Sequence, residues 1–347
     1  MEDIILEFKK KYWKRIKRRA NVHGFSSMLH PRIKDGKEVP GTNCIRIYVE
    51  KKLPACQLSP KDLIPRALDL GGSIVEIDVV ELPRMRYLDE PEDRTTPIDH
   101  QKRYRPVQAG TSCMHRNGTA CTLSWYFWKG KKLYIALNNH CGSLENTANI
   151  GDEWLQPSPY DGGVYPRDTI AKLSFYVPTK YETFKCPVRN FLLRIFKVLF
   201  HVTHFRAYEP TNHVDISFGE PISRDILSFK IFGIEGKITG KGKHVIGAKV
   251  YKSGRTTGVT EGVIVDPAWN GYVYGRRGKA WYEDCVLVKG KCAGGDSGSP
   301  TISKSPDGLL YHGALFAGSD EFWIYCKVEN IEREANVKLA THLNTPF

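Results

Sequence analysis

The sequence has no long hydrophobic run, no glycine-rich nucleotide-binding loop and no cluster of metal ligands. A membrane-spanning helix needs about 18 or more consecutive apolar residues, so we expect no transmembrane segment. The histidines are scattered along the chain, without the spacing of a zinc site. These absences disfavour a membrane-embedded protein, a nucleotide-dependent enzyme and a metalloprotein, and we expect neither a cofactor nor a metal.

The N-terminal segment also lacks the order of a secretory signal. Its short apolar stretch, Ile4 to Leu6, precedes the basic residues, whereas a signal has the reverse order and a cleavage site of small residues. We therefore expect a cytoplasmic protein. The 9 cysteines, an odd number, are then expected mainly as buried thiols.

Acidic residues are fewer than basic ones, and the formal net charge of +13 favours an anionic partner. Residues 1–20 carry much of the excess, and their apolar side chains recur at the spacing of an amphipathic helix. Such helices either bind an anionic membrane surface or pack an apolar stripe on the protein body, and we favour the second. Nucleic-acid binding is disfavoured, because no zinc-finger, helix-turn-helix or RNP-like pattern accompanies the charge.

Residues 188–205 (VRNFLLRIFKVLFHVTHF) show a second amphipathic pattern, which predicts a helix inserted in a loop. We favour a helix that covers the neighbouring β-structure. The alternative is a helix that docks on a partner or on an anionic membrane surface.

The first part of the chain divides by composition into a module and a linker. Residues 21–83 contain two β-prone runs, Thr42 to Glu50 and Ser73 to Val80, with a short helix predicted over Ser59 to Ile64. They indicate a small α+β module. Residues 84–105 are rich in charge and proline and poor in apolar side chains, which is typical of a linker.

Residues 106–347 contain many short, alternating apolar runs separated by Gly, Asn, Asp and Pro. Frequent short strands between turn residues indicate an antiparallel sandwich or barrel. No internal repeat is evident.

Residues 294–300 (GGDSGSP) hold the most informative side chain, Ser297. A serine hydroxyl becomes a useful nucleophile only when a base takes its proton and donors await the oxyanion. The flanking glycines allow the N–H groups of Gly295 and Ser297 to turn inward as such donors. Taken alone, the run is also compatible with an ordinary turn, since its residues are turn residues.

A histidine and an aspartate elsewhere complete the pattern. His140 follows the apolar run that ends at Leu137, as suits a general base on a rigid scaffold. Asp215 lies at the start of an apolar strand, Val214 to Phe218, where a buried carboxylate can orient the imidazole. The chain order His, Asp, Ser is that of chymotrypsin-like enzymes rather than of subtilisin or the α/β-hydrolases.

Three other residues compete for these roles. Asp161 and Asp168 lie between His140 and Ser297 but among turn residues, and we rank both behind Asp215. His213 is the rival of His140, and it lacks the cysteine that follows His140.

These motifs resemble those of the trypsin-like serine peptidases over roughly Pro106 to the C-terminus. Residues 295–300 resemble the serine signature, Asn139-His140-Cys141 is similar to the histidine motif, and Val214-Asp215-Ile216 is similar to the aspartate motif. Residues 252–258 (KSGRTTG) resemble a stretch in a divergent branch with bacterial and plant narrow-leaf-type members. That branch also carries an N-terminal α+β module.

The resemblance implies a mainly β fold with two antiparallel six-stranded β-barrels and the active site between them. His140 and Asp215 would come from the first barrel and Ser297 from the second. The run Gly313 to Gly318 would pair with substrate backbone. Its last three residues, Phe316, Ala317 and Gly318, would then bind substrate.

The resemblance also implies a disulfide between Cys121 and Cys141 that would hold the histidine loop. It places Lys291, six residues before the serine, near the base of the primary specificity pocket. A lysine there would favour an acidic substrate side chain; the alternative is that Lys291 points to solvent.

The sequence departs from the family pattern in several respects. Ser299 stands where the family most often has glycine, and the interval from His140 to Asp215 is longer than usual. No Ile-Val-Gly-Gly stretch precedes the barrels, so we do not expect a new N-terminus to pair with Asp296. We expect Asp296 to orient its loop through local backbone hydrogen bonds.

The sequence therefore predicts a serine endopeptidase that acts on a protein or peptide substrate through an acyl-enzyme. The alternative is a peptidase-like fold that has lost its activity and serves as a binding or scaffold protein. The presence of His140, Asp215, Ser297 and Gly295 together favours the enzyme.

Overall fold

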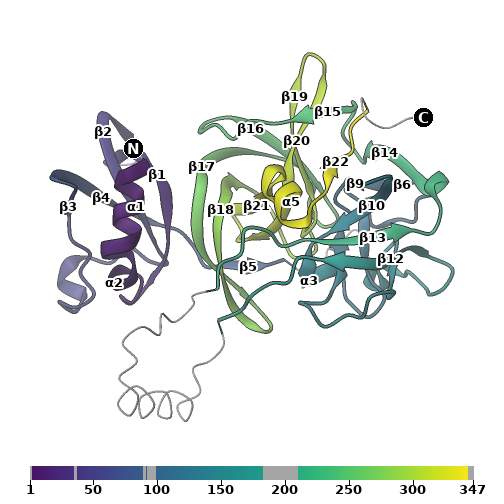
Figure 1. Cartoon of the computed structure of the whole chain (residues 1–347), viewed down its shortest axis with the longest axis horizontal. Coiled ribbons are helices and arrows are strands. Elements are labelled where there is room, and N and C mark those ends of the chain that lie inside the picture. The colour runs from purple at the N-terminus through teal and green to yellow at the C-terminus, as the bar shows by residue number, and fades with distance from the viewer. Residues whose placement is uncertain (1, 35–36, 89–90, 92–98, 183–209, 343–347) are drawn as a thin grey trace, which may run out of the picture.

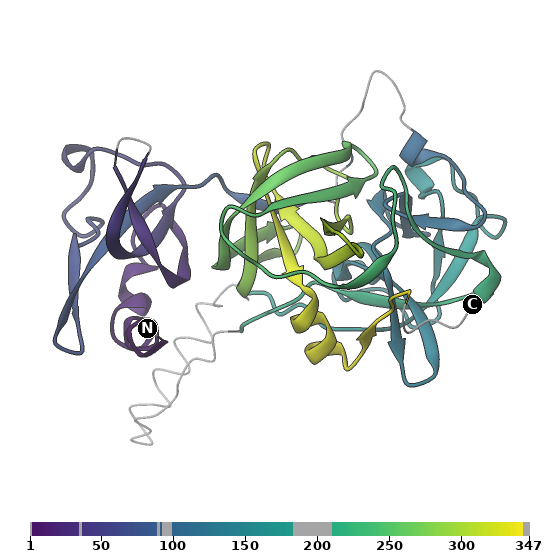
Figure 2. The same cartoon turned by 90° about the horizontal axis from the view of Figure 1, so that it is seen from above.

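The computed structural model describes residues 2–34, 37–88, 91, 99–182 and 210–342. Figure 1 shows three bodies of β-structure in a row: a small N-terminal module, a closed barrel at the centre and a curled barrel beyond it. Figure 2 shows the same row from above. Among the described residues, no helix is long and apolar enough to cross a membrane.

The curled barrel consists of an eight-stranded sheet in the order β22-β9-β10-β13-β12-β11-β7-β8. Within the described residues its end strands, β22 and β8, do not pair with each other, so the sheet curls without closing. Two further strands, β6 and β14, pair in parallel. The strands are β6 (Val107–Ala109), β7 (Ser112–His115), β8 (Cys121–Thr122), β9 (Tyr126–Lys129), β10 (Lys132–Leu137), β11 (Glu153–Leu155), β12 (Thr169–Tyr176), β13 (Ser217–Pro221), β14 (Leu227–Ile231) and β22 (Lys338–Leu339).

The closed barrel is a ring of six strands in the order β16-β19-β20-β21-β18-β17, and β17 pairs back to β16. A two-residue turn joins β17 to β18, and Gly278 after it has φ +115°, which favours glycine. The elements are β15 (Ile238–Lys241), β16 (Lys249–Gly254), β17 (Gly258–Gly275), β18 (Gly278–Gly290), β19 (Pro300–Ser305), β20 (Gly308–Gly318), β21 (Phe322–Lys327) and α5 (Val328–Ala335).

The N-terminal module shares its sheet with the closed barrel. Its strand β1 pairs antiparallel with the far half of β17, so the order β17-β1-β2-β4-β3 is continuous. The segment predicted as a helix over Ser59 to Ile64 is instead a single turn, closed by the N–H of Asp62 on the carbonyl of Ser59. The elements are α1 (Glu2–Phe8), the π-helix Lys9–Trp13, α2 (Lys14–Ile16), β1 (Val22–Lys34), β2 (Lys37–Val49), β3 (Ala67–Leu70) and β4 (Ser73–Glu81).

The module's core also draws on the β17–β18 hairpin. The ring of Phe25 lies 4.5 Å from that of Trp13 and 6.2 Å from that of Trp281, centroid to centroid. Phe8, Trp13 and Ile16 are buried in this core. The apolar stripe of the basic N-terminal helix therefore packs on the protein body, which is the arrangement we favoured from the sequence.

Part of the predicted linker is a strand. β5 (Met85–Tyr87) pairs with both β17 and β20. The average composition of residues 84–105 is polar and hides the three apolar side chains Met85, Tyr87 and Leu88. The helix predicted over residues 188–205 lies outside the described residues.

Candidate active site

His140 lies in a helical turn at the point where a central strand of the curled barrel ends. β10 ends at Leu137, and α3 (Asn139–Gly142) begins after Asn138, whose backbone is extended. The side-chain amide of Asn138 donates to the main-chain carbonyl of Asp215, 2.8 Å away. His140 is buried, so the loop holds its imidazole in a fixed place.

Asp215 contacts His140 at two points. Its Oδ2 accepts a hydrogen bond from Nδ1 of the ring, and its Oδ1 accepts from the main-chain N–H of His140 at 3.3 Å. The Asp215 side chain is fully buried, and its own N–H donates to Sγ of Cys326 at 3.2 Å. A carboxylate bonded to Nδ1 fixes the ring orientation and directs Nε2 toward proton transfer.

The rival aspartates are engaged by arginines instead of by His140. Asp168 accepts from Arg103 at 2.8 Å and from Arg167 at 2.7 Å. Burial raises the pKa of Asp168, but these hydrogen bonds and one from a main-chain N–H outweigh it and lower the pKa to about 2. Asp161 pairs with the buried guanidinium of Arg255. Neither carboxylate contributes to the histidine site.

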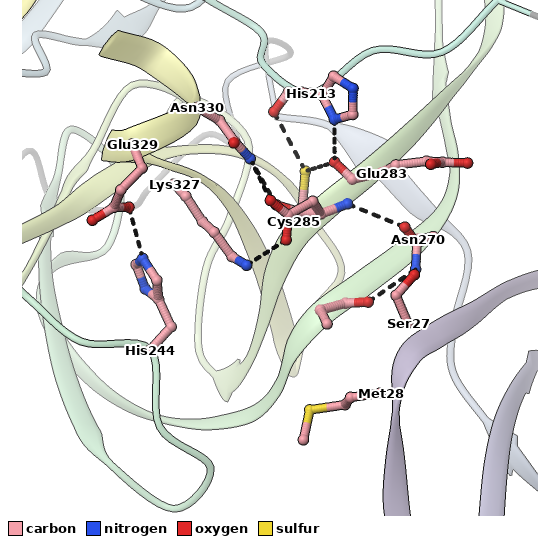
Figure 3. A network of polar contacts seen from close by, with 12 residues as sticks. Ser27, Met28, His213, His244, Asn270, Glu283, Cys285, Lys327, Glu329 and Asn330 are labelled. Carbon is pink, nitrogen blue, oxygen red and sulfur yellow. Dashed lines mark hydrogen bonds and ion pairs between the residues drawn. The ribbon is translucent and has the colours of Figure 1, made fainter. Parts of the chain in front are cut away.

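The rival histidine, His213, supports the loop that leads to Asp215. Figure 3 shows its ring turned toward β18, where Nδ1 lies 3.3 Å from the main-chain carbonyl of Glu283. The thiol of Cys285 donates weakly to the carbonyl of His213 at 3.9 Å. These contacts place His213 against the closed barrel as a structural residue.

A disulfide connects the histidine loop to the neighbourhood of the serine. Cys121 and Cys141 are bonded, with their Cα atoms 6.2 Å apart. The next residue, Thr122, donates its N–H to the carbonyl of Ser297 at 2.7 Å and its hydroxyl to the carbonyl of Gly295 at 2.9 Å. The bridge thus fixes His140 relative to the segment that contacts the serine loop.

The serine loop requires glycine at two positions. Gly295 has φ +95° and Gly298 has φ +98°, a region that residues with a Cβ rarely adopt. A Cβ at Gly295 would meet the Thr256 hydroxyl, and a Cβ at Gly298 would meet the main-chain carbonyl of Thr122. Ser297 lies between them and is buried.

Asp296 forms a buried ion pair with Lys252, which the sequence did not predict. Lys252 Nζ lies 3.0 Å from Oδ2, and both side chains are fully buried. The N–H groups of Thr256 and Thr257 donate to Oδ1 at 2.9 and 3.0 Å. Burial raises the pKa of Asp296, but Lys252 and Thr257 outweigh it, and the pKa lies below its ordinary value.

The run KSGRTTG over residues 252–258 thus has a structural role in the site. It supplies the cation and the threonines that hold Asp296, and Arg255 reaches across to Asp161 of the curled barrel. In the sequence, this role is indicated only by a lysine and two threonines that follow the apolar strand residues Val250 and Tyr251. The sequence does not show which carboxylate they bind, because Lys252 and Asp296 are 44 positions apart.

The strand expected to bind substrate pairs with the chain's own β5. Ala317 is opposite Tyr87 and Gly318 is opposite Arg86 in an antiparallel register. The carbonyl of Phe316 accepts a hydrogen bond from the Ser297 hydroxyl at 3.2 Å. Of the three predicted binding residues on β20, Phe316 contacts the serine, and Ala317 and Gly318 pair with β5.

Leu88, which follows β5, contacts the serine and the predicted oxyanion donor. Its N–H donates to Oγ of Ser297 at 3.1 Å. Its carbonyl oxygen accepts from the N–H of Gly295 at 2.6 Å. The ring of Tyr87 stacks on that of His140, with centroids 4.5 Å apart and planes inclined by 22°. These contacts bring Ser297, Gly295 and His140 around one short segment.

Comparison with known proteins finds likeness in structure and none in sequence: no family model and no curated protein matches the chain. Protease A of Thermobifida fusca matches with a TM-score of 0.45 and 16% identity over 68% of this chain and 98% of its own. A chymotrypsin of Cellulomonas bogoriensis matches at 0.44 and 17% over 68% and 98%. A Nocardiopsis protease matches at 0.44 and 18% over 68% and 99%.

The described strands form the mainly β double barrel that the sequence predicted, with a closed barrel beside a curled one. At these identities and TM-scores the likeness says nothing of activity or of site residues. Within the described residues only the second barrel closes as a ring of six strands, so the first differs from the expected six-stranded form.

The resemblance implied a position for Lys291 near the base of the primary specificity pocket, with a solvent-facing side chain as the alternative. Its side chain is exposed, and the buried group that contacts Leu88 is apolar and includes Cys292 and Leu315. Burial raises the pKa of the Cys292 thiol to about 12, so this group carries no charge at neutral pH. An ammonium group without a partner would be costly inside this apolar group. The Lys291 side chain is instead exposed to solvent.

Among the described residues, one group has the composition of a metal site. Sulfur atoms of Cys121 and Cys141 and a ring nitrogen of His140 lie within 4.8 Å of one another. The two sulfurs are bonded to each other, so neither is a thiolate that would hold a metal. The group is the disulfide beside the histidine, and its residues do not fit a metal.

Proposed function

We propose that the chain is a serine endopeptidase with Ser297 as nucleophile, His140 as general base and Asp215 as the group that orients the base. One observation carries the proposal: Oγ of Ser297 accepts the N–H of Leu88, and the carbonyl oxygen of the same residue accepts the N–H of Gly295. The contact between Asp215 and His140 supports the same assignment.

In the proposed reaction, Oγ of Ser297 attacks a peptide carbonyl while His140 takes its proton. The N–H of Gly295 stabilises the oxyanion, and the N–H of Ser297 is the second expected donor. His140 then protonates the leaving amine and an ester of Ser297 remains. Water, activated by His140, releases the acid and restores the serine.

The proposed substrate is a protein or peptide that binds in extended form. The edge of β20 at Ala317 and Gly318 offers main-chain groups to an antiparallel strand, as its pairing with β5 shows. Main-chain pairing gives affinity with little sequence preference, and side-chain pockets add specificity.

The proposal is tested by labelling with a fluorophosphonate, which reacts with an activated serine. Because residues 85–88 lie against Ser297, the labelled protein is Leu88→Asp, whose charged side chain is expected to leave the apolar group around it. We expect rapid labelling of this variant and none when Ser297→Ala or His140→Ala is added. A folded Leu88→Asp protein that stays unlabelled would establish the alternative, an inactive peptidase-like binding protein.

A further inference from the structure

Residues 85–88 lie in the proposed site in the way a substrate would. β5 adds to the edge of β20 in antiparallel register, and it comes from the connection between the N-terminal module and the curled barrel. Figure 1 shows β5 crossing from the module toward the two barrels. The segment is also held on its other side by pairing of Met85 with Val273 on β17.

The carbonyl group of Leu88 has the surroundings of a reacting carbonyl. Its oxygen accepts the Gly295 N–H at 2.6 Å, and the N–H of the same residue lies 3.1 Å from Oγ of Ser297. Proximity of a nucleophile to a carbonyl whose oxygen already has its donor is what acyl transfer requires. A segment that only connected the module to the curled barrel would not need a hydrogen bond between its carbonyl and the Gly295 N–H.

The Leu88 side chain fills an apolar group in the closed barrel. The side chain is buried together with Val286, Cys292 and Leu315. A Cβ at Gly318 would approach Cδ1 of Leu88 to 3.2 Å, so the glycine leaves space for the leucine. A side chain of this size and without charge is therefore selected at the position before the reacting bond.

Tyr87 fixes the segment at the histidine. Its ring stacks on His140, and its hydroxyl bonds to that of Tyr282 at 2.8 Å. With Leu88 at Ser297 and Tyr87 at His140, two successive residues contact the two reacting side chains.

We propose that the chain cleaves itself after Leu88, at the peptide bond to Asp89, and that the site prefers leucine before the cleaved bond. The proposal rests on the proposed function. Oγ of Ser297 bonds to the Leu88 carbonyl carbon, and its proton passes to His140. The bond from that carbon to the nitrogen of Asp89 breaks, and the proton goes to that nitrogen. Water then cleaves the ester, which leaves a carboxylate at Leu88 and the free serine.

The two products are expected to stay together. Residues 1–88 remain attached through the pairing of β1 with β17 and through the core shared by Phe25 and Trp281. Because β5 is part of the same product, the new carboxylate of Leu88 stays near Gly295. We expect the cleaved protein to be inhibited by its own product until the segment is displaced.

The test is intact-mass spectrometry of the purified full chain. We expect the wild type to yield two copurifying fragments that end at Leu88 and begin at Asp89, and Ser297→Ala to stay whole. Leu88→Met, which keeps an uncharged side chain of similar size, is expected to be cleaved. Leu88→Asp is expected to be cleaved on the order of 100-fold more slowly and yet to label faster with fluorophosphonate than the wild type.

Mixing cleaved wild type with Ser297→Ala separates cleavage within one chain from cleavage between chains. We expect the Ser297→Ala chain to stay whole. Its residues 85–88 lie in its own site, and they would have to leave that site before another chain could cleave them. A wild type that stays whole while its Ser297 is labelled would overturn self-cleavage and leave the proposed function standing. Cleavage at another bond, or of Leu88→Asp at the wild-type rate, would overturn the role of Leu88. Absence of labelling in every variant would refute the proposed function itself.

Discussion

The two loops that present His140 and Ser297 are held by different chemistry. The histidine loop of the curled barrel is fastened by a disulfide between Cys121 and Cys141. The serine loop of the closed barrel is fastened by the buried ion pair of Lys252 and Asp296. A disulfide is insensitive to pH in the acid range but is broken by a reductant. An ion pair is unaffected by a reductant but is lost when acid protonates its carboxylate.

The serine loop is the more sensitive of the two loops to the loss of a partner, because it contains a buried charge. Asp296 is fully buried, so its charge is tolerated only because Lys252, Thr256 and Thr257 surround it. Removing one partner leaves an uncompensated charge, which costs more than the pair itself contributes. Removing a disulfide leaves no charge behind.

The largest effect is expected from Lys252→Met. The variant keeps Asp296 in a buried place without its cation, and we expect its free energy of unfolding to fall by about 3–5 kcal/mol. Urea denaturation measures the change. Lys249→Met is the matched control on the same strand, since Lys249 pairs with Glu261 at the surface and its loss should leave the free energy of unfolding nearly unchanged. Equal effects of the two variants would show that the buried pair is not what holds the serine loop.

The double variant Cys121→Ser/Cys141→Ser is expected to have the next largest effect. The bridge spans 20 residues, and its loss should lower the free energy of unfolding by about 2–4 kcal/mol and slow the labelling of Ser297. A thiol reductant should reproduce the loss in the wild type and do nothing to the double variant. Cys56→Ser, at an exposed free cysteine, is the control. A reductant that affects both proteins alike would contradict the assignment.

A smaller effect on the free energy of unfolding is expected when the pH is lowered. The pKa of Asp296 is lower in the folded than in the unfolded protein, so its stabilising contribution is present above about pH 4 and is lost on acidification through the folded pKa. In Lys252→Met the cation that lowers the pKa of Asp296 is gone, and burial, the largest single influence, is opposed only by the remaining hydrogen bonds, so the pKa of Asp296 rises. The difference in unfolding free energy between this variant and the wild type should therefore narrow from about pH 8 to pH 4. A difference that stays constant over this range would contradict the ion pair.

The sequence predicted local features better than contacts between distant segments. His140 and Asp215 were named from their position at strand ends, and the structure brings them into contact. Lys252 was missed as the partner of Asp296, because a pairing between strand β16 and the serine loop has no local signature. Lys291 is exposed, which is the alternative that the sequence left open, because the residue that faces a pocket depends on the path of the loop that carries it.

The predicted linker shows the same limit. Its average composition is polar, yet Met85, Tyr87 and Leu88 within it find buried positions that other segments provide. Residues in a short strand of this kind depend on β17 and β20 for their hydrogen bonds, so no property of the strand alone reveals it.

The most direct test of the account is to locate the fluorophosphonate adduct in the folded Leu88→Asp variant by peptide mapping. We expect one adduct, on Ser297, that disappears when His140→Ala is added. A folded, unreactive protein, or an adduct that persists without His140, would contradict the assignment of Ser297 and His140 as nucleophile and base.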